Sequence, residues 1–212
     1  MSSIISQPTS EVSYNQGLFF VFSAGVLWST VGISIRLIED ASVWQILLYR
    51  SLALSTFLYF VIRFRSGENP FVQVRRSGLP AAFAGLALVA AYSGGIYSIK
   101  VIPVANALLL FATAPFMAAV LGWIVLRERV RYTTWIAILV AIGSIMIMVS
   151  GQTSNGALDG TLAALGSAFG FALFTIALRW GRSEEMLPAV FLSGVFTIVI
   201  ASIICLLMGL PF

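Results

Sequence analysis

The chain carries one charged residue well inside a hydrophobic segment, away from both of its ends. Arg50 is the only charged residue between Val43 and Ile62. An arginine near the centre of a bilayer costs about 2.5 to 3.5 kcal/mol on insertion scales, and it usually faces a bundle interior or a water-filled cavity. A guanidinium binds carboxylates and phosphates well. The placement therefore predicts that Arg50 contacts a small-molecule substrate bearing an anionic group.

Two other roles for Arg50 are open at the level of sequence. The residue lies about 10 Å from the start of its segment at 1.5 Å per residue, so its side chain could extend to the nearby headgroups. It could also form a structural ion pair with Glu39 or Asp40. All eight acidic residues lie in the N-terminal lead, the connections or the helix ends. A proton relay through intramembrane carboxylates therefore has no candidate in this sequence.

Three further residues could complete a binding site with Arg50. Trp28, Tyr92 and Asn106 lie within other hydrophobic segments. Ligand pockets combine aromatic walls with few polar groups, so we predict stacking by the rings and hydrogen bonding by the amide. The alternative is helix packing, or an aromatic belt at the membrane surface.

The sequence lacks the residues and motifs of the common enzyme classes. The chain has no histidine and one cysteine, Cys205. It has no phosphate-binding GxxxxGK[ST] loop, no GxSxG elbow and no HExxH pair. We therefore predict that the protein is not an enzyme and has no catalytic residue, metal or cofactor. The net charge of +4 comes with arginines in short connections, which predicts no nucleic-acid partner.

The elements that must position these residues are membrane-spanning helices. Hydrophobic residues make up 59% of the chain and charged residues 9%, and the mean hydropathy is +1.00. Runs of about 20 apolar residues match a bilayer core about 30 Å thick. The fold class is therefore all-α, a polytopic membrane helix bundle, with the lipid bilayer as a partner. Seven runs occur, at 17–37, 43–62, 79–99, 104–126, 133–149, 158–180 and 187–208.

Basic residues in the connections predict the orientation of these helices. Short cytoplasmic connections are enriched in lysine and arginine. Nine basic residues would lie on one side and two on the other, Arg36 and Lys100. We therefore place the N-terminus in the cytoplasm. The nine are Arg63, Arg65, Arg75, Arg76, Arg127, Arg129, Arg131, Arg179 and Arg182.

An internal repeat is suggested by two similar segments. Aligning 17–36 with 160–179 matches Gly17 with Gly160, Ile33 with Ile176 and Arg36 with Arg179. Five helices separate the copies, so the copies would cross the membrane in opposite directions, as in many secondary transporters. We predict a polar lead at 1–16, a five-helix repeat at 17–150, a linker at 151–159 and a partial second repeat at 160–212.

Helix packing is indicated by two patterns of small residues and proline. Ala84, Ala87, Ala91, Gly94 and Ser98 share one face of the third run, and small residues let membrane helices approach closely. Gly166 and Gly170 form a GxxxG pattern in the sixth run. Pro115 is predicted to kink the fourth run.

Several motifs resemble the EamA-like transporters of the drug/metabolite transporter superfamily. They are "GVLWSTVGISIRLI", "LLYR", "AAYSGGIYSIKVIPVANALLLFATAPFMAAVLGWIVLRERV" and "TTWIAILVAIGSIMIMV". In that family a proline in the fourth helix precedes a Leu-Gly-Glu-Arg-type sequence. Pro115 and "LRERV" occupy these places here, with Arg127 in place of the glycine. Glu128 within this motif is interpreted as part of a structural ion pair with arginines at the cytoplasmic helix end.

The resemblance implies a secondary transporter in a bacterial plasma (inner) membrane, exporting a small metabolite by alternating access. Members of the family resemble ten-helix proteins with two five-helix repeats, whereas seven helices are expected here. The chain would thus be truncated after the seventh helix, or another chain, as in a homo-oligomer, would complete the bundle. A seven-helix receptor or sensor and an inactive fragment of a permease are the alternative functions.

Overall fold

The computed structural model describes residues 14–38, 40–150, 157–181 and 186–210, and within them the protein is all-helical, as predicted. Seven stretches of these residues are long and apolar enough to span a membrane. The helices are α1 (Tyr14–Leu37), α2 (Val43–Ser66), α3 (Pro70–Val101), α4 (Val104–Phe111), α5 (Ala114–Val125), α6 (Tyr132–Ser150), α7 (Ala157–Trp180) and α8 (Leu187–Leu207).

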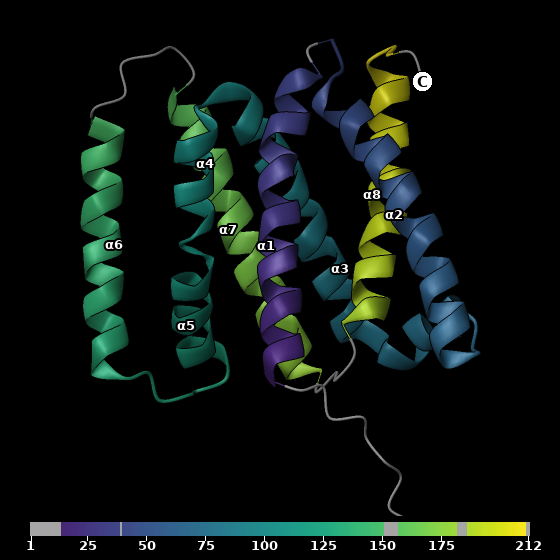
Figure 1. Cartoon of the computed structure of the whole chain (residues 1–212), viewed down its shortest axis with the longest axis horizontal. Helices are drawn as coiled ribbons and strands as arrows, with labels where there is room; N and C mark the ends of the chain where they lie inside the picture. The colour runs from purple at the N-terminus through teal and green to yellow at the C-terminus, as the bar shows by residue number, and fades with distance from the viewer. Residues whose placement is uncertain (1–13, 39, 151–156, 182–185, 211–212) are drawn as a thin grey trace, which may run out of the picture. The chain divides into compact units, whose positions relative to one another are not determined.

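The chain consists of two units. The first, Met1–Ile38, contains α1, and the second, Glu39–Phe212, contains α2 to α8 (Figure 1). Serine and threonine hydroxyls along α1 donate to carbonyls three or four residues earlier, as Ser29 does to Gly25 at 3.0 Å. These bonds satisfy hydroxyl donors within the helix, which is what an apolar environment requires.

The fourth apolar run is divided into α4 and α5. The division lies at Ala112 and Thr113, and Pro115 occupies the first turn of α5. Proline has no N–H to donate to the carbonyl of Phe111, so a continuous helix would lose a bond there. Thr113 bridges the break, because its amide donates to the Leu110 carbonyl at 3.1 Å and its hydroxyl donates to the same carbonyl at 2.6 Å.

Helix α3 begins with a short segment before the membrane-spanning part. The polar residues at 70–76 predict a connection, whereas they form a helical segment that ends at Gly78, with φ 62° and ψ −152°. This conformation is essentially restricted to glycine. The Asn69 side chain accepts from the Phe71 amide and caps the segment.

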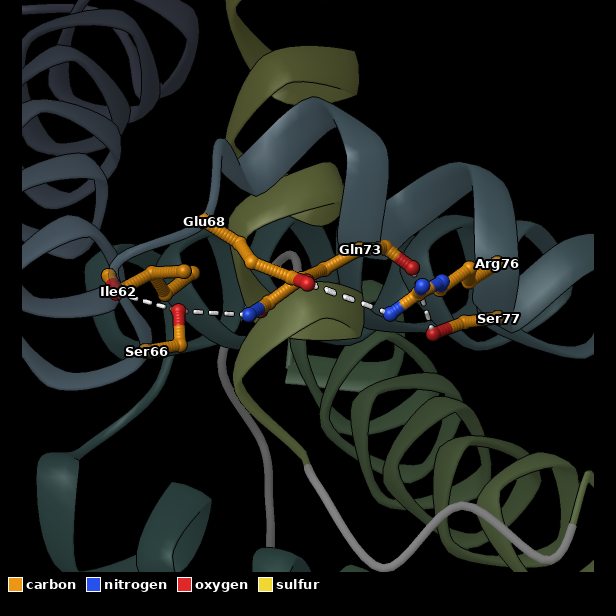
Figure 2. Close-up of polar contacts among 6 residues, drawn as sticks. All are labelled: Ile62, Ser66, Glu68, Gln73, Arg76 and Ser77. Atoms are coloured by element: carbon orange, nitrogen blue, oxygen red, sulfur yellow. Dashed lines mark hydrogen bonds and ion pairs between the residues drawn. The ribbon is translucent and has the colours of Figure 1, made fainter.

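A polar network joins this short segment to the end of α2 (Figure 2). The Gln73 amide donates to the Ser66 hydroxyl at 2.7 Å, and that hydroxyl donates to the Ile62 carbonyl at 2.7 Å. Arg76 and Glu68 form an exposed ion pair at 3.4 Å. The connection between α2 and α3 is therefore ordered by side-chain bonds.

The centre of the second unit is the crossing of α3 and α7. The predicted small-residue face of α3 is buried, with Ala84, Ala91 and Ser98 fully covered. A Cβ added at Gly170 would lie 2.8 Å from the Ala87 carbonyl oxygen, so the two backbones are nearly in contact. Gly166, the other glycine of the GxxxG pattern, has no atom within 4 Å of such a Cβ. Of the two glycines in the GxxxG pattern, Gly170 is therefore the one that lies at this crossing.

A second seam joins α2 to α8, and α8 also packs on α3. Leu58 and Ile62 of α2 form a buried cluster with Phe191 of α8. Farther along, Gly194 lies against Ser55, and the serine hydroxyl occupies the space that a Cβ at position 194 would need. In contrast, α6 has one buried residue, Ile138, which fits a helix largely surrounded by lipid.

Candidate functional site

The site is organised around Arg50 on α2. The start of α2 is fixed by a capping box, in which the Gln45 amide donates to the Ser42 hydroxyl at 3.2 Å and the Ser42 amide donates to the Gln45 side chain at 2.8 Å. Two turns later, the Arg50 guanidinium carbon lies 4.1 Å from the ring centroid of Tyr92 on α3. This distance is that of a cation–π contact.

Tyr92 is held in turn by α7. Its ring meets Phe171 edge-to-face, with centroids 5.9 Å apart and an interplanar angle of 82°. The adjacent backbone is fixed by Ser167, whose hydroxyl donates to the Ala91 carbonyl at 2.7 Å. Gly170 brings α7 close enough for both contacts. Contacts between α3 and α7 therefore hold the ring on which the guanidinium of α2 rests.

The Arg50 guanidinium retains free donor capacity. Its Nη1 atom is buried and has no hydrogen-bond partner among the described residues. A side chain that extended to the headgroups would keep its guanidinium in water, whereas Nη1 of Arg50 is buried. A buried donor without a partner costs free energy, about 1 to 3 kcal/mol and more for a charged group. A carboxylate or phosphate oxygen is the kind of group that would satisfy it.

The other predicted residues lie on other helices. Trp28 is exposed on α1 in the first unit, and Asn106 is half-buried in the first turn of α4. Pro115 lies at the break between α4 and α5. Arg50 and Tyr92 are the two predicted residues that the structure brings into contact.

Sequence reasoning missed Phe171 as part of this site. It follows Gly170, a glycine at which α7 closely approaches α3, and that adjacency was the available signal. A single sequence does not tell which ring on another helix a phenylalanine will meet. The contact with Tyr92 follows from the rotation of α7 about its own axis.

Glu128 forms an ion pair, as the sequence analysis expected, but with a partner on another helix. Its carboxylate lies 2.8 Å from the Arg179 guanidinium at the end of α7. Both side chains are about half exposed, so the pair contributes little stability by itself, about 0 to 1 kcal/mol. It does connect the α5–α6 connection to α7.

These features define an all-helical membrane protein with a positively charged side chain, that of Arg50, inside its helix bundle. Nη1 of this guanidinium has no hydrogen-bond partner among the described residues. The EamA-like transporter family model matches residues 15–150, which is more than half of the chain. The chain belongs to the EamA-like transporter family and is an integral membrane transporter of the drug/metabolite type. It matches no curated protein and no solved structure.

Proposed function

We propose that this transporter is a secondary carrier that exports a small metabolite bearing an anionic group. The observation that carries the proposal is the Arg50 guanidinium, held on the ring of Tyr92 with a buried and unpartnered Nη1. The Tyr92 ring lies against the guanidinium carbon, and a guanidinium can donate two parallel hydrogen bonds to a carboxylate or phosphate. Trp28 and Asn106 are proposed as further contacts with the substrate.

Alternating access is the proposed mechanism. In this scheme residues 17–150 form one repeat, 160–212 belong to an inverted second repeat, and substrate binds between them. Close glycine and alanine contacts such as Gly170 on Ala87 allow neighbouring helices to rock as packed bodies. The membrane is proposed to be a bacterial plasma membrane with the N-terminus in the cytoplasm, because nine basic residues share that side.

Counterflow tests the carrier mechanism and the charge of the substrate together. The chain is reconstituted in liposomes preloaded with one unlabelled compound, and uptake of the same labelled compound is measured for small carboxylates and their neutral amides. We expect at least one carboxylate, and not its amide, to accumulate transiently, because a carrier exchanges bound substrate across the membrane. Equal accumulation of the amide would exclude an anion-selective site, and downhill flux without acceleration by internal compound would indicate a channel.

The orientation can be tested with cysteine labelling. Arg75→Cys places a thiol at an exposed position in the first segment of α3, and Arg131→Cys places one in the α5–α6 connection; these two parts lie at the same end of the second unit (Figure 1). In intact bacterial cells we expect an impermeant maleimide to label neither variant, and to label both after permeabilisation. Pro103→Cys, exposed before α4, is the control that should react in intact cells. Labelling of either arginine variant in intact cells would contradict the orientation.

A further inference from the structure

A separate cleft lies between the end of α5 and the start of α6, away from Arg50. It has a volume of about 650 Å³ and includes the connection between the two helices. The connection lies at the end of the bundle where α2 also meets α3 (Figure 1). Because α5 and α6 belong to membrane-spanning stretches, this end lies at the height of the lipid headgroups. Its lining residues are Trp123, Ile124, Arg127, Glu128, Arg129, Val130 and Trp135.

The charge of the cleft is positive. Glu128 is its acidic lining residue, and Arg179 on α7 already neutralises that carboxylate at 2.8 Å. Arg127 and Arg129 are exposed and form no ion pair within the described part of the chain. Two guanidinium groups are therefore available to an external anion.

The walls of the cleft are aromatic. Trp123 and Trp135 meet edge-to-face, with centroids 5.4 Å apart and an interplanar angle of 88°. Tryptophan side chains favour the boundary between acyl chains and headgroups, because the ring is apolar and the indole N–H can be hydrated. A cleft with indole walls and arginines on its connection suits a ligand that is itself amphiphilic.

The backbone at Arg127 adds an independent observation. Its φ is 55°, the left-handed conformation that often ends a helix and that glycine adopts most easily. An L-residue with a side chain pays roughly 1 to 2 kcal/mol in this conformation. The chain places an arginine where glycine would be less strained, which points to a use for the side chain.

We propose that this cleft binds the headgroup of an anionic phospholipid. Arg127 and Arg129 contact the phosphate, and Trp123 and Trp135 contact the glycerol and the first acyl carbons. Arginine forms paired hydrogen bonds with phosphate oxygens, and basic pockets between membrane helices on one face bind acidic headgroups in this way. This proposal requires only that the protein lies in a membrane, and it does not depend on whether Arg50 binds a transported substrate.

Lipid retention measures this site directly. The chain is purified from mixed phosphatidylglycerol and phosphatidylcholine nanodiscs, released into mild detergent, and analysed by native mass spectrometry for bound lipid. We expect preferential retention of phosphatidylglycerol by the unchanged chain. A basic side chain near an anionic surface contributes about fivefold to binding, so Arg127→Gln with Arg129→Gln should lower retention by about 25-fold.

Two matched variants separate the cleft from general charge and from misfolding. Arg75→Gln with Arg76→Gln removes the same charge from the same end outside the cleft, and should retain lipid as the unchanged chain does. Arg127→Gly with Arg129→Gln relieves the left-handed backbone, so the fold should be at least as stable while lipid is lost. Equal losses in the Arg75/Arg76 pair, or undiminished retention without Arg127 and Arg129, would overturn the proposal. Displacement of lipid by millimolar glycerol 3-phosphate would also overturn it, by assigning the cleft to a soluble phosphate.

Discussion

Arg50→Gln is expected to weaken binding of an anionic ligand by about 10- to 100-fold, because it removes charge-assisted hydrogen bonds worth about 1.5 to 3 kcal/mol. The counterflow signal of the responding carboxylate should fall accordingly. The glutamine side chain is neutral, so the variant no longer keeps a charge at a buried position without a hydrogen-bond partner. Its thermal stability should therefore stay the same or rise. Loss of binding in a stable protein then reports on the site.

Neighbouring substitutions sharpen this test. Arg50→Lys keeps the charge but loses the planar pair of donors, so binding should be intermediate. Tyr92→Phe keeps the ring under the guanidinium and should have little effect, whereas Tyr92→Leu removes the ring and should weaken binding. Arg63→Gln, exposed at the other end of α2, is the control for net charge. Unchanged ligand affinity in folded Arg50→Gln would remove this residue from the substrate site.

Gly170→Ala is expected to destabilise the bundle by about 1 to 3 kcal/mol, the usual cost of an inserted methyl group in a packed interior. The new Cβ would lie 2.8 Å from the Ala87 oxygen and 2.9 Å from the Ala91 nitrogen, and both are backbone atoms that cannot rotate away. Helices α3 and α7 must separate to admit it. Cys205 is fully buried, so a thiol-reactive fluorophore can follow unfolding on heating.

Gly166→Ala is the matched control for this substitution. It lies one turn earlier on α7, and its added Cβ would meet no atom within 4 Å. Alanine is the better helix former by about 0.5 to 1 kcal/mol, so this variant should melt at the same or a higher temperature. Equal melting temperatures for the two variants would show that α3 and α7 are not held at this crossing. If the crossing is correct, Gly170→Ala should also weaken ligand binding at Arg50, because Phe171 moves away from Tyr92.

The spans and the family could be predicted from the sequence because they depend on local composition. An apolar run must form a helix in lipid, where every backbone donor and acceptor needs a partner inside the segment. The runs at 43–62 and 133–149 therefore lie within α2 and α6. The family resemblance, which the family model confirms over residues 15–150, comes from motifs that are also contiguous.

The short helix before Gly78 was missed because its polar residues looked like those of a connection. Residues Pro70 to Ser77 contain two arginines, a glutamine and a serine, which in a membrane protein indicate water. Caps and side-chain bonds, such as Asn69 to the Phe71 amide and Gln73 to Ser66, make a helix of them at the membrane surface. Polarity therefore left the conformation of this segment open.

The sequence alone determined that Arg50 is a charge within an apolar helix, and it indicated close helix packing at Gly166 and Gly170. The structure shows that packing at Gly170 and, among the described residues, no neighbour at Gly166. Only the tertiary structure decided that Tyr92 lies beneath the guanidinium, that Phe171 supports the tyrosine, and that Arg179 takes the carboxylate of Glu128. The physical reason is that lipid tails are as apolar as the helix surfaces, so hydrophobicity does not select which face of one helix packs on which face of another. Interdigitation of small and large side chains sets the rotation of each helix, and that is a property of pairs of helices rather than of either segment.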